Sequence, residues 1–220
     1  MKKKKGKRST RISILEAAGQ LFAEKGFKGA TIRDICHKAD VNIAAVNYHF
    51  GDKDGLYDSL IEYIFEEMRD KFPIQRAEDD TLEPKDRLYA FIEVLLYRRH
   101  SPDLRRWHGI LFERERMQPK AAVRAMHERE ISRMKKVLNS IIKGFVGDKI
   151  DDDTADLLRE SVISQIVFQG LIREKAAPPF LKKKPMDAAT IQKTARHITD
   201  FSVAALERYN QSSSQKRKPK

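Results

Sequence analysis

An asparagine, a tyrosine and a histidine occupy positions 47 to 49, just after a pair of alanines at 44 and 45. The amide of Asn47 can both donate and accept hydrogen bonds at the edge of a base pair. The hydroxyl of Tyr48 can bond to a phosphate, and its ring can pack on a sugar or a methyl group. Alanines let a helix approach the bases closely and can contact thymine methyl groups. This combination is typical of a surface that reads duplex DNA.

Two short helices joined by a tight turn must position these side chains. Thr31 predicts a helix N-cap, with Asp34 three positions later in a capping-box-like arrangement. Residues 40–42, Asp-Val-Asn, predict a turn. A second helix is expected from Ile43 to Phe50, and Gly51 should end it. The pattern predicts a helix-turn-helix, whose second helix lies in the DNA major groove.

Helical geometry separates the two faces of the second helix, because an α-helix turns by about 100° per residue. If Val46 faces the core, Ile43 and Phe50 lie within about 60° of it and Ala44 and Tyr48 point away. Lys53 and Thr31 are placed for phosphate contacts near helix N-termini. The candidate DNA contacts are therefore Thr31, Arg33, Asn42, Ala44, Ala45, Asn47, Tyr48, His49 and Lys53.

Other interpretations of these residues remain open at the level of sequence. Asn47 and Tyr48 could be merely solvated. His49 could be a histidine at the edge of the core, hydrogen-bonded within its own domain. Cys36 lies on the apolar face of its helix and is expected to be a packed core thiol.

The net charge of +12 is concentrated at the two ends of the chain. Residues 1–11 carry +7 and residues 211–220 carry +4, which leaves +1 for the remainder. Both ends lack apolar residues to bury, so we expect a disordered basic arm and a disordered basic tail. The arm could add phosphate or minor-groove contacts, or serve solubility alone, which is the interpretation that we favour for the tail. Residues 12–55 carry a net charge of −1, so DNA binding would depend on local placement of charge.

The composition of the 220 residues, 40% hydrophobic and 35% charged, is that of a soluble helical protein. No apolar run approaches the roughly 20 residues that span a membrane, and no apolar segment follows the basic start as in a secretory signal. The single cysteine excludes an intrachain disulfide and indicates a reducing compartment, so we expect the bacterial cytoplasm. Neither a phosphate-binding loop nor a nucleophile elbow is present, and no metal-ligand spacing emerges. We expect no catalysis, no cofactor and no metal.

An all-α fold is predicted, with a helix-turn-helix domain at 12–55 and a larger helical domain for ligand binding and dimerisation at 56–210. Residues 73–84 are polar and contain two prolines, which predicts a loop. Apolar residues recur with helical spacing through most of the remaining chain. The expected helices span about 10–25, 32–39, 43–50, 52–71, 88–96, 104–117, 123–141, 153–175 and 186–209.

Two further surfaces are predicted from the larger domain. The helix at 153–175 is apolar over much of its circumference, which favours a subunit interface of a homodimer, formed as a four-helix bundle with the last helix. The candidate interface residues are Val162, Ile166, Gln169, Ile198, Ser202 and Ala205. An apolar pocket with a few polar groups is the default ligand site. Its candidate lining is Phe91, Leu95, Trp107, His108, Leu111, Arg114, Met126 and Met134.

Residues 14 to 61, ILEAAGQLFAEKGFKGATIRDICHKADVNIAAVNYHFGDKDGLYDSLI, closely resemble the TetR family of bacterial transcriptional regulators. Many members carry a second aromatic residue where this chain has Asn47. The Val-Asn-Tyr-His-Phe-Gly form resembles the subgroup with a CecR (YbiH-like) C-terminal domain, and residues 107–122 are similar to that domain, with Lys120 where threonine is expected. The resemblance implies an Ω-shaped helical homodimer. Its fourth helix, about residues 52–71 here, would act as a lever that a bound ligand shifts.

Two functions from different classes follow. The first is a ligand-responsive repressor that binds a palindromic DNA operator as a dimer and is released by a small-molecule effector. The alternative is a helical interaction protein that binds DNA only non-specifically, through its basic ends. Sequence preference that survives deletion of residues 1–11 would distinguish them.

Overall fold

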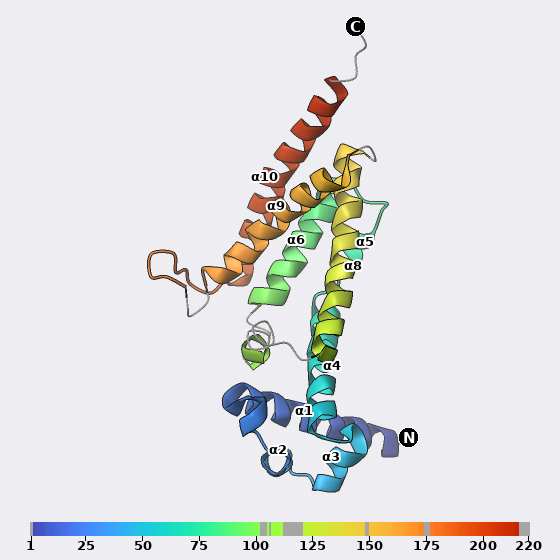
Figure 1. Ribbon diagram of the computed structural model, residues 1–220, viewed down its shortest axis with the longest axis vertical. Coiled ribbons are helices and arrows are strands. Elements are labelled where there is room, and N and C mark those ends of the chain that lie inside the picture. Colours follow the sequence, from blue (N-terminus) through green and yellow to red (C-terminus); the bar gives the residue numbers. More distant parts are fainter. Residues whose placement is uncertain are drawn as a thin grey trace. The chain divides into compact units, whose positions relative to one another are not determined.

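The computed structural model describes residues 2–101, 105, 107–111, 121–147, 150–173 and 177–215 (Figure 1). Within these residues the fold is all-helical and contains no strand, as the periodicity predicts. A short helical segment also lies at 107–111. The helices are α1 (Lys2–Gly29), α2 (Ile32–Ala39), α3 (Ile43–Phe50), α4 (Lys53–Lys71), α5 (Gln75–Glu78), α6 (Pro84–His100), α8 (Ala121–Val146), α9 (Asp152–Leu171) and α10 (Ala188–Gln215). None of them offers the long apolar stretch that crossing a bilayer would require.

The chain divides into two compact units. The first unit comprises Met1–Asp70 and Arg105–Glu128, and the second comprises Lys71–Leu104 and Arg129–Lys220. Most of α4 and the segment at 107–111 belong to the first unit.

An aromatic cluster forms the centre of the first unit. Phe22 of α1 is fully buried, and its ring centroid lies 5.6 Å from that of Phe27 and 5.0 Å from that of Tyr57 in α4. Gly26 sits between the two phenylalanines with a positive φ of 76°, so the chain bends there and returns Phe27 to the ring of Phe22. The cluster fixes α1 against the start of α4, the two helices that flank the helix-turn-helix.

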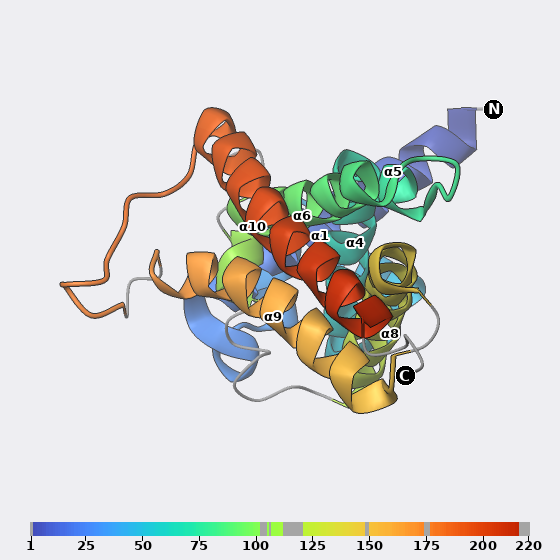
Figure 2. The ribbon, with the colours of Figure 1, turned by 90° about the horizontal axis from the view of Figure 1, so that it is seen from above.

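The second unit packs α5, α6, α8, α9 and α10 around one apolar core. α6, α9 and α10 run side by side (Figures 1 and 2). Arg87 of α6 is buried but satisfied, since its guanidinium donates to the carbonyl of Ala77 at 3.1 Å and to Ser140 Oγ at 3.2 Å. Arg98 pairs with Glu130 at 2.9 Å.

Three elements differ from the sequence-based expectation. Residues 2–11 form the first turns of α1, and α10 continues to Gln215, although both ends were expected to be disordered. Residues 73–84 contain the short helix α5, because Ile74 and Ala77 are buried in the core of the second unit and draw the chain inward. Of the helix expected at 104–117, the structure describes residue 105 and the turn at 107–111, and the remainder lies outside the described residues.

The structure also corrects the expected dimer surface. Val162, Ile166, Ile198 and Ser202 are at most 4% exposed and belong to the interior of the second unit, because these faces of α9 and α10 pack inward. Gln169 is half-buried and Ala205 is exposed. Large apolar side chains do remain exposed on these two helices: Leu157, Val167, Phe168, Leu171, Phe201 and Tyr209.

Candidate nucleic-acid interface

Local hydrogen bonds define α2 and the turn that follows it. The side chain of Thr31 accepts a hydrogen bond from the backbone N–H of Asp34 at 3.1 Å, which caps the helix as predicted. Hydrogen bonds to its carboxyl, first from Lys25 and then from Thr31, hold the pKa of Asp34 below its ordinary value. At the other end, Asp40 adopts a left-handed conformation with φ 53°, and its N–H bonds to the carbonyls of Cys36 and His37. These contacts produce the tight turn into α3.

Helix α3 is fixed at both ends. Asn42 is its N-cap, with Oδ1 accepting from the N–H of Ala45 at 2.9 Å. Gly51 ends the helix at a positive φ of 78°, and its N–H bonds to the carbonyl of Asn47 at 3.0 Å. Asp52 then accepts from the N–H of Gly55 at 2.8 Å and caps α4. Asn42 was expected to contact DNA. Because its side-chain oxygen accepts the capping hydrogen bond, its NH₂ group is the part that can donate to a nucleic acid.

We expect Asn42→Ala to lower the free energy of unfolding by about 0.5–2 kcal/mol, because the mutation removes the cap of α3. Urea unfolding followed by circular dichroism measures this change. Asn42→Ser is the matched control, since serine caps equally well. Equal destabilisation by both substitutions would show that the cap is not responsible.

The outer face of α3 is exposed as predicted. Val46 is fully buried, whereas Tyr48 is 69% exposed, and Ala44 and Asn47 are also exposed. Ala45 is half-buried on the flank. Ile43 corrects the prediction, because its side chain is 47% exposed rather than facing the core. It extends the apolar part of the outer face at the N-terminal end of α3.

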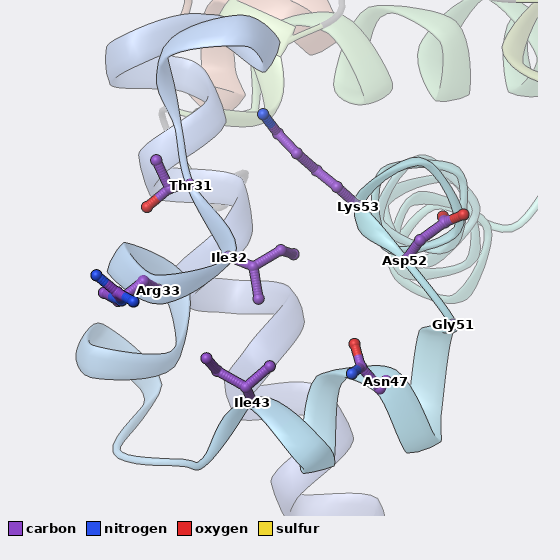
Figure 3. Close-up of a pocket in the computed structure, with 8 residues that line it drawn as sticks. All are labelled: Thr31, Ile32, Arg33, Ile43, Asn47, Gly51, Asp52 and Lys53. Carbon is purple, nitrogen blue, oxygen red and sulfur yellow. The ribbon is translucent and has the colours of Figure 1, made fainter.

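A surface hollow of about 530 Å³ lies between α2, α3 and the start of α4 (Figure 3). Residues from all three elements line it: Thr31, Ile32, Arg33, Ile43, Asn47, Gly51, Asp52 and Lys53. Four of the predicted DNA contacts thus come together at one place. Arg33 is exposed on α2, so its guanidinium is accessible to a phosphate.

Two cations lie over aromatic rings beside this surface. Lys53 Nζ is 4.7 Å from the ring centroid of Phe27, and Arg11 Cζ is 5.4 Å from that of Phe50. Lys53 is therefore directed toward the aromatic cluster, which sequence reasoning did not foresee. His49 is half-buried between Tyr48 and Phe50, with ring centroids at 5.1 and 5.9 Å. This position agrees with the alternative in which His49 lies at the edge of the core.

The candidate ligand residues are divided between the two units. Trp107, His108, Leu111 and Met126 belong to the first unit. Phe91, Leu95 and Met134 belong to the second unit, where Phe91 is fully buried core and the other two are partly buried. Arg114 lies outside the described residues.

A tryptophan plug attaches residues 105–111 to α1 and α4 in the first unit. The ring of Trp107, which is 8% exposed, lies directly on Gly19 of α1, where any Cβ would overlap it. Arg105 pairs with Glu16 of α1 at 2.6 Å and with Glu67 of α4 at 3.5 Å. We refer to Trp107, Arg105 and these three partners as the Trp107 plug.

Two further polar side chains, His108 and Tyr63, interact with Glu67 of the Trp107 plug. His108 Nε2 lies 3.5 Å from the Glu67 carboxylate, and the His108 side chain is 1% exposed. Burial, followed by the nearby charge of Glu67, raises the pKa of Tyr63. Glu16, Gly19, Glu67 and Arg105 were not singled out from the sequence. The sequence contained one signal for this contact, Gly19, because a glycine inside a helix often marks a place where another group packs closely on the backbone.

No group of three histidine, cysteine or carboxylate side chains in the described part of the chain is arranged to hold a metal ion. Cys36 is buried, and burial raises the pKa of its thiol, in agreement with a packed structural cysteine. The candidate interface consists of polar, aromatic and cationic side chains on the short capped helices α2 and α3 and at the start of α4.

Comparison with known families agrees with this geometry. Residues 14–60 match the family model described as bacterial regulatory proteins, tetR family. Residues 84–206 match the C-terminal domain of the HTH-type transcriptional dual regulator CecR. These two matches together cover most of the chain.

Individual relatives are also regulators. The chain is 28% identical over 182 residues to CecR of Shigella flexneri, covering 77% of this chain and 79% of that protein. It is 31% identical over 100 residues to the probable HTH-type transcriptional regulator YttP of Bacillus subtilis, covering 45% of this chain and about half (48%) of that protein. The fold is similar to that of the TetR family regulator PfmR from Thermus thermophilus, with a TM-score of 0.59 at 19% identity over 87% of this chain and 97% of that one.

Proposed function

Because the chain belongs to the TetR family of DNA-binding transcriptional regulators and carries a CecR-type C-terminal domain, we propose that it is a ligand-responsive repressor. It would bind a palindromic operator as a homodimer in the bacterial cytoplasm and leave the operator when a small-molecule effector binds. The observation that carries the proposal is the outer face of α3. Asn47 and Tyr48 are exposed there, on a helix whose inner residue Val46 is fully buried and whose two ends are capped.

The contacts with DNA would divide into two kinds. Asn47 and the alanines would meet base edges, and Tyr48 would meet the backbone or a thymine methyl. Arg33 and Thr31, on the far side of the hollow, would hold phosphates. The lysine-rich first turns of α1 add positive charge, and Arg11 ties that helix to Phe50 at the end of α3. Those charges would raise affinity without reading sequence.

A second copy would pack on the exposed apolar face of α9 and α10. Six large apolar side chains on these helices are 40% or more exposed: Leu157, Val167, Phe168, Leu171, Phe201 and Tyr209. A two-fold interface uses the same patch on both subunits, and α9 and α10 with their symmetry mates would form a four-helix bundle. Two reading helices related by a two-fold axis match a palindromic operator.

The Trp107 plug would couple effector binding to the reading helices. It joins residues 105–111, which lie within the CecR-type domain match, to α1 and α4 of the first unit. An effector that displaced this segment would release Glu67 on α4 and Glu16 on α1 together. Coupling of about 2.7 kcal/mol is sufficient for a 100-fold loss of DNA affinity.

Asn47→Ala tests base reading directly. We expect the substitution to relax preference at particular operator positions, at a cost of about 1–3 kcal/mol for each base-specific hydrogen-bonded pair that it removes. Selection from a randomised duplex pool followed by sequencing measures the change. Lys38→Ala, on the exposed end of α2, is the matched control and should leave the preferred sequence unchanged.

The competing function is non-specific binding through the basic ends. It predicts that deletion of residues 1–11 abolishes DNA binding and that wild-type protein selects no sequence from the pool. The repressor proposal predicts weaker binding after that deletion, with the selected sequence retained. An unchanged pool after selection by the wild-type protein would contradict the repressor proposal.

A further inference from the structure

Three nitrogen-rich side chains converge where α6 and α9 end, at the same end of the second unit (Figure 1). Arg99 and His100 are the penultimate and last residues of α6, and Arg173 follows α9. The Arg99 guanidinium packs directly on the backbone of buried Gly170, at a point where any Cβ would overlap it. The positive charges of Arg99 and Arg173 both act on His100 and lower its pKa. We call Arg99, His100 and Arg173 the α6–α9 basic cluster.

Two buried nitrogen atoms of this cluster have no hydrogen-bond partner in the described part of the chain: Nε of Arg173 and Nε2 of His100. Arg173 uses Nη1 for its two side-chain bonds, both to Gln169, with the backbone carbonyl and Oε1 each at 2.8 Å. Other buried arginines of the same unit are satisfied differently. Arg98 pairs with Glu130 and Arg159 pairs with Asp156, whereas Arg87 donates to a backbone carbonyl and a serine hydroxyl. Among the residues that the structure describes, Arg173 has no such carboxylate.

Capping of helix ends accounts for only part of this arrangement. Cations stabilise helix C-termini, and the bond from Arg173 to the Gln169 carbonyl has that role. This capping bond leaves Arg173 Nε without an acceptor in the described part of the chain. Capping also does not explain why a histidine lies beside two guanidinium groups. Burial first, and then the charges of Arg99 and Arg173, lower the pKa of His100 to about 4, so the imidazole is neutral at physiological pH. Within the described part of the chain, no ion pair or hydrogen bond brings a carboxylate to Arg173 or His100.

We propose that the α6–α9 basic cluster binds an oxyanion, the carboxylate or phosphate group of the small-molecule effector. An oxyanion there accepts from Arg173 Nε, pairs with the Arg99 guanidinium and accepts a third hydrogen bond from the ring N–H of the neutral His100 imidazole. Arginine suits this purpose, because its planar guanidinium matches the geometry of both groups. The inference rests on the proposed function in taking the anion to be part of an effector. It adds the chemical class of that effector and the place of its charged end.

Nuclear magnetic resonance of histidine-labelled full-length protein tests the proposal with simple ions. Inorganic phosphate and acetate are titrated at constant ionic strength maintained with sodium chloride, with acetamide as the neutral analogue of acetate. His100→Gln identifies the His100 signal among those of the six histidines. We expect that signal to shift saturably with phosphate or acetate, and not with acetamide. The tighter of the two ions indicates whether the effector carries a phosphate or a carboxylate.

Variants separate a built site from a chance ion. We expect Arg173→Gln to weaken anion binding by at least about tenfold, and Arg173→Lys, which retains the charge, to weaken it less. Arg76→Gln, at an exposed arginine of α5, is the matched control and should bind as wild type. Thermal melting verifies the fold, and Arg99→Gln serves if Arg173→Gln does not fold. Equal dissociation constants for Arg173→Gln and wild type, or an equal response to acetamide, would mean an adventitious ion only and would overturn the proposal.

The result is independent of the repressor assignment, because no DNA is present in the titration. Failure of the proposed function would appear instead as absence of sequence preference in wild-type protein. Arg173→Gln should still select the wild-type operator, since its side chain belongs to the second unit.

Discussion

Replacing Gly19 with leucine should destabilise the first unit by about 3–5 kcal/mol, comparable to losing a buried aromatic side chain. Gly19 is buried in the middle of α1, and the ring of Trp107 occupies the space that a side chain would need. The Arg105 guanidinium, which pairs with Glu16 and Glu67, lies 5.9 Å from the ring centroid of Trp107 and stabilises the ring in this position, so a leucine side chain and the ring compete for the same space. The substitution should therefore expel Trp107 from its seat. Because the chain contains a single tryptophan, a red shift of the emission spectrum reports the expulsion directly.

Gly109→Leu is the matched control for this experiment. Gly109 is also helical and lies two residues after Trp107. Among the described residues, nothing beyond its own stretch of helix lies within 4 Å of the place where a Cβ would stand. Leucine there should be neutral or slightly stabilising, because it is a better helix former than glycine. Urea unfolding followed by tryptophan fluorescence compares the two variants. The same stability change at both positions would contradict the close seating of Trp107 on α1.

Phe22→Ala should lower the free energy of unfolding by about 3–5 kcal/mol as well. The side chain is fully buried, and its ring contacts both Phe27 and Tyr57. Its removal leaves a cavity at the junction of α1 and α4, the helices that support α2 and α3. Calorimetric melting of the full chain measures the loss, and operator binding should fall with it as the reading helix loses its support.

Tyr48→Ala provides the contrast. Tyr48 is an aromatic residue of the same unit, but it is 69% exposed on the outer face of α3. Its substitution should change stability by no more than about 0.5 kcal/mol, while lowering affinity for the operator. A loss of DNA binding without loss of stability separates reading residues from supporting ones. If Tyr48→Ala proved as destabilising as Phe22→Ala, the assignment of the outer face would be wrong.

Local signals in the sequence were sufficient to position the reading helix. Thr31, Asn42 and Asp52 each cap the helix that follows them, and Gly51 ends α3 at a positive φ. Such caps act through hydrogen bonds within three residues, so their effects are visible in a short window of sequence. The buried and exposed faces of α3 follow from the period of the helix, apart from Ile43 at its first turn.

Contacts between distant segments were not accessible in the same way. Lys53 lies over Phe27, and Trp107 lies on Gly19, because tertiary packing joins segments that no local pattern connects. The expected dimer residues show the same limit. Val162 and Ile166 are apolar at the predicted spacing, but α9 is apolar on two faces, and periodicity alone does not say which face the monomer buries.

The grouping of the candidate ligand residues into one pocket stays a prediction. Trp107 and Phe91 are both large, apolar and buried, yet they belong to different units. Composition identifies side chains that can line a pocket, whereas their grouping depends on the fold. The α6–α9 basic cluster was equally invisible, since Arg99 and Arg173 are far apart in the chain.

Fluorescence anisotropy with the DNA just upstream of the protein's own gene tests the central claim most directly. A scrambled duplex of equal length is the reference, and the salt concentration is about 150 mM, at which non-specific dissociation constants are typically 10⁻⁴–10⁻⁶ M. A sequence-specific repressor of its own promoter should bind the upstream DNA at least about 10³-fold more tightly than the scrambled duplex. Equal affinity for the two duplexes, abolished by deletion of residues 1–11, would show that the basic end alone binds DNA and would contradict the claim.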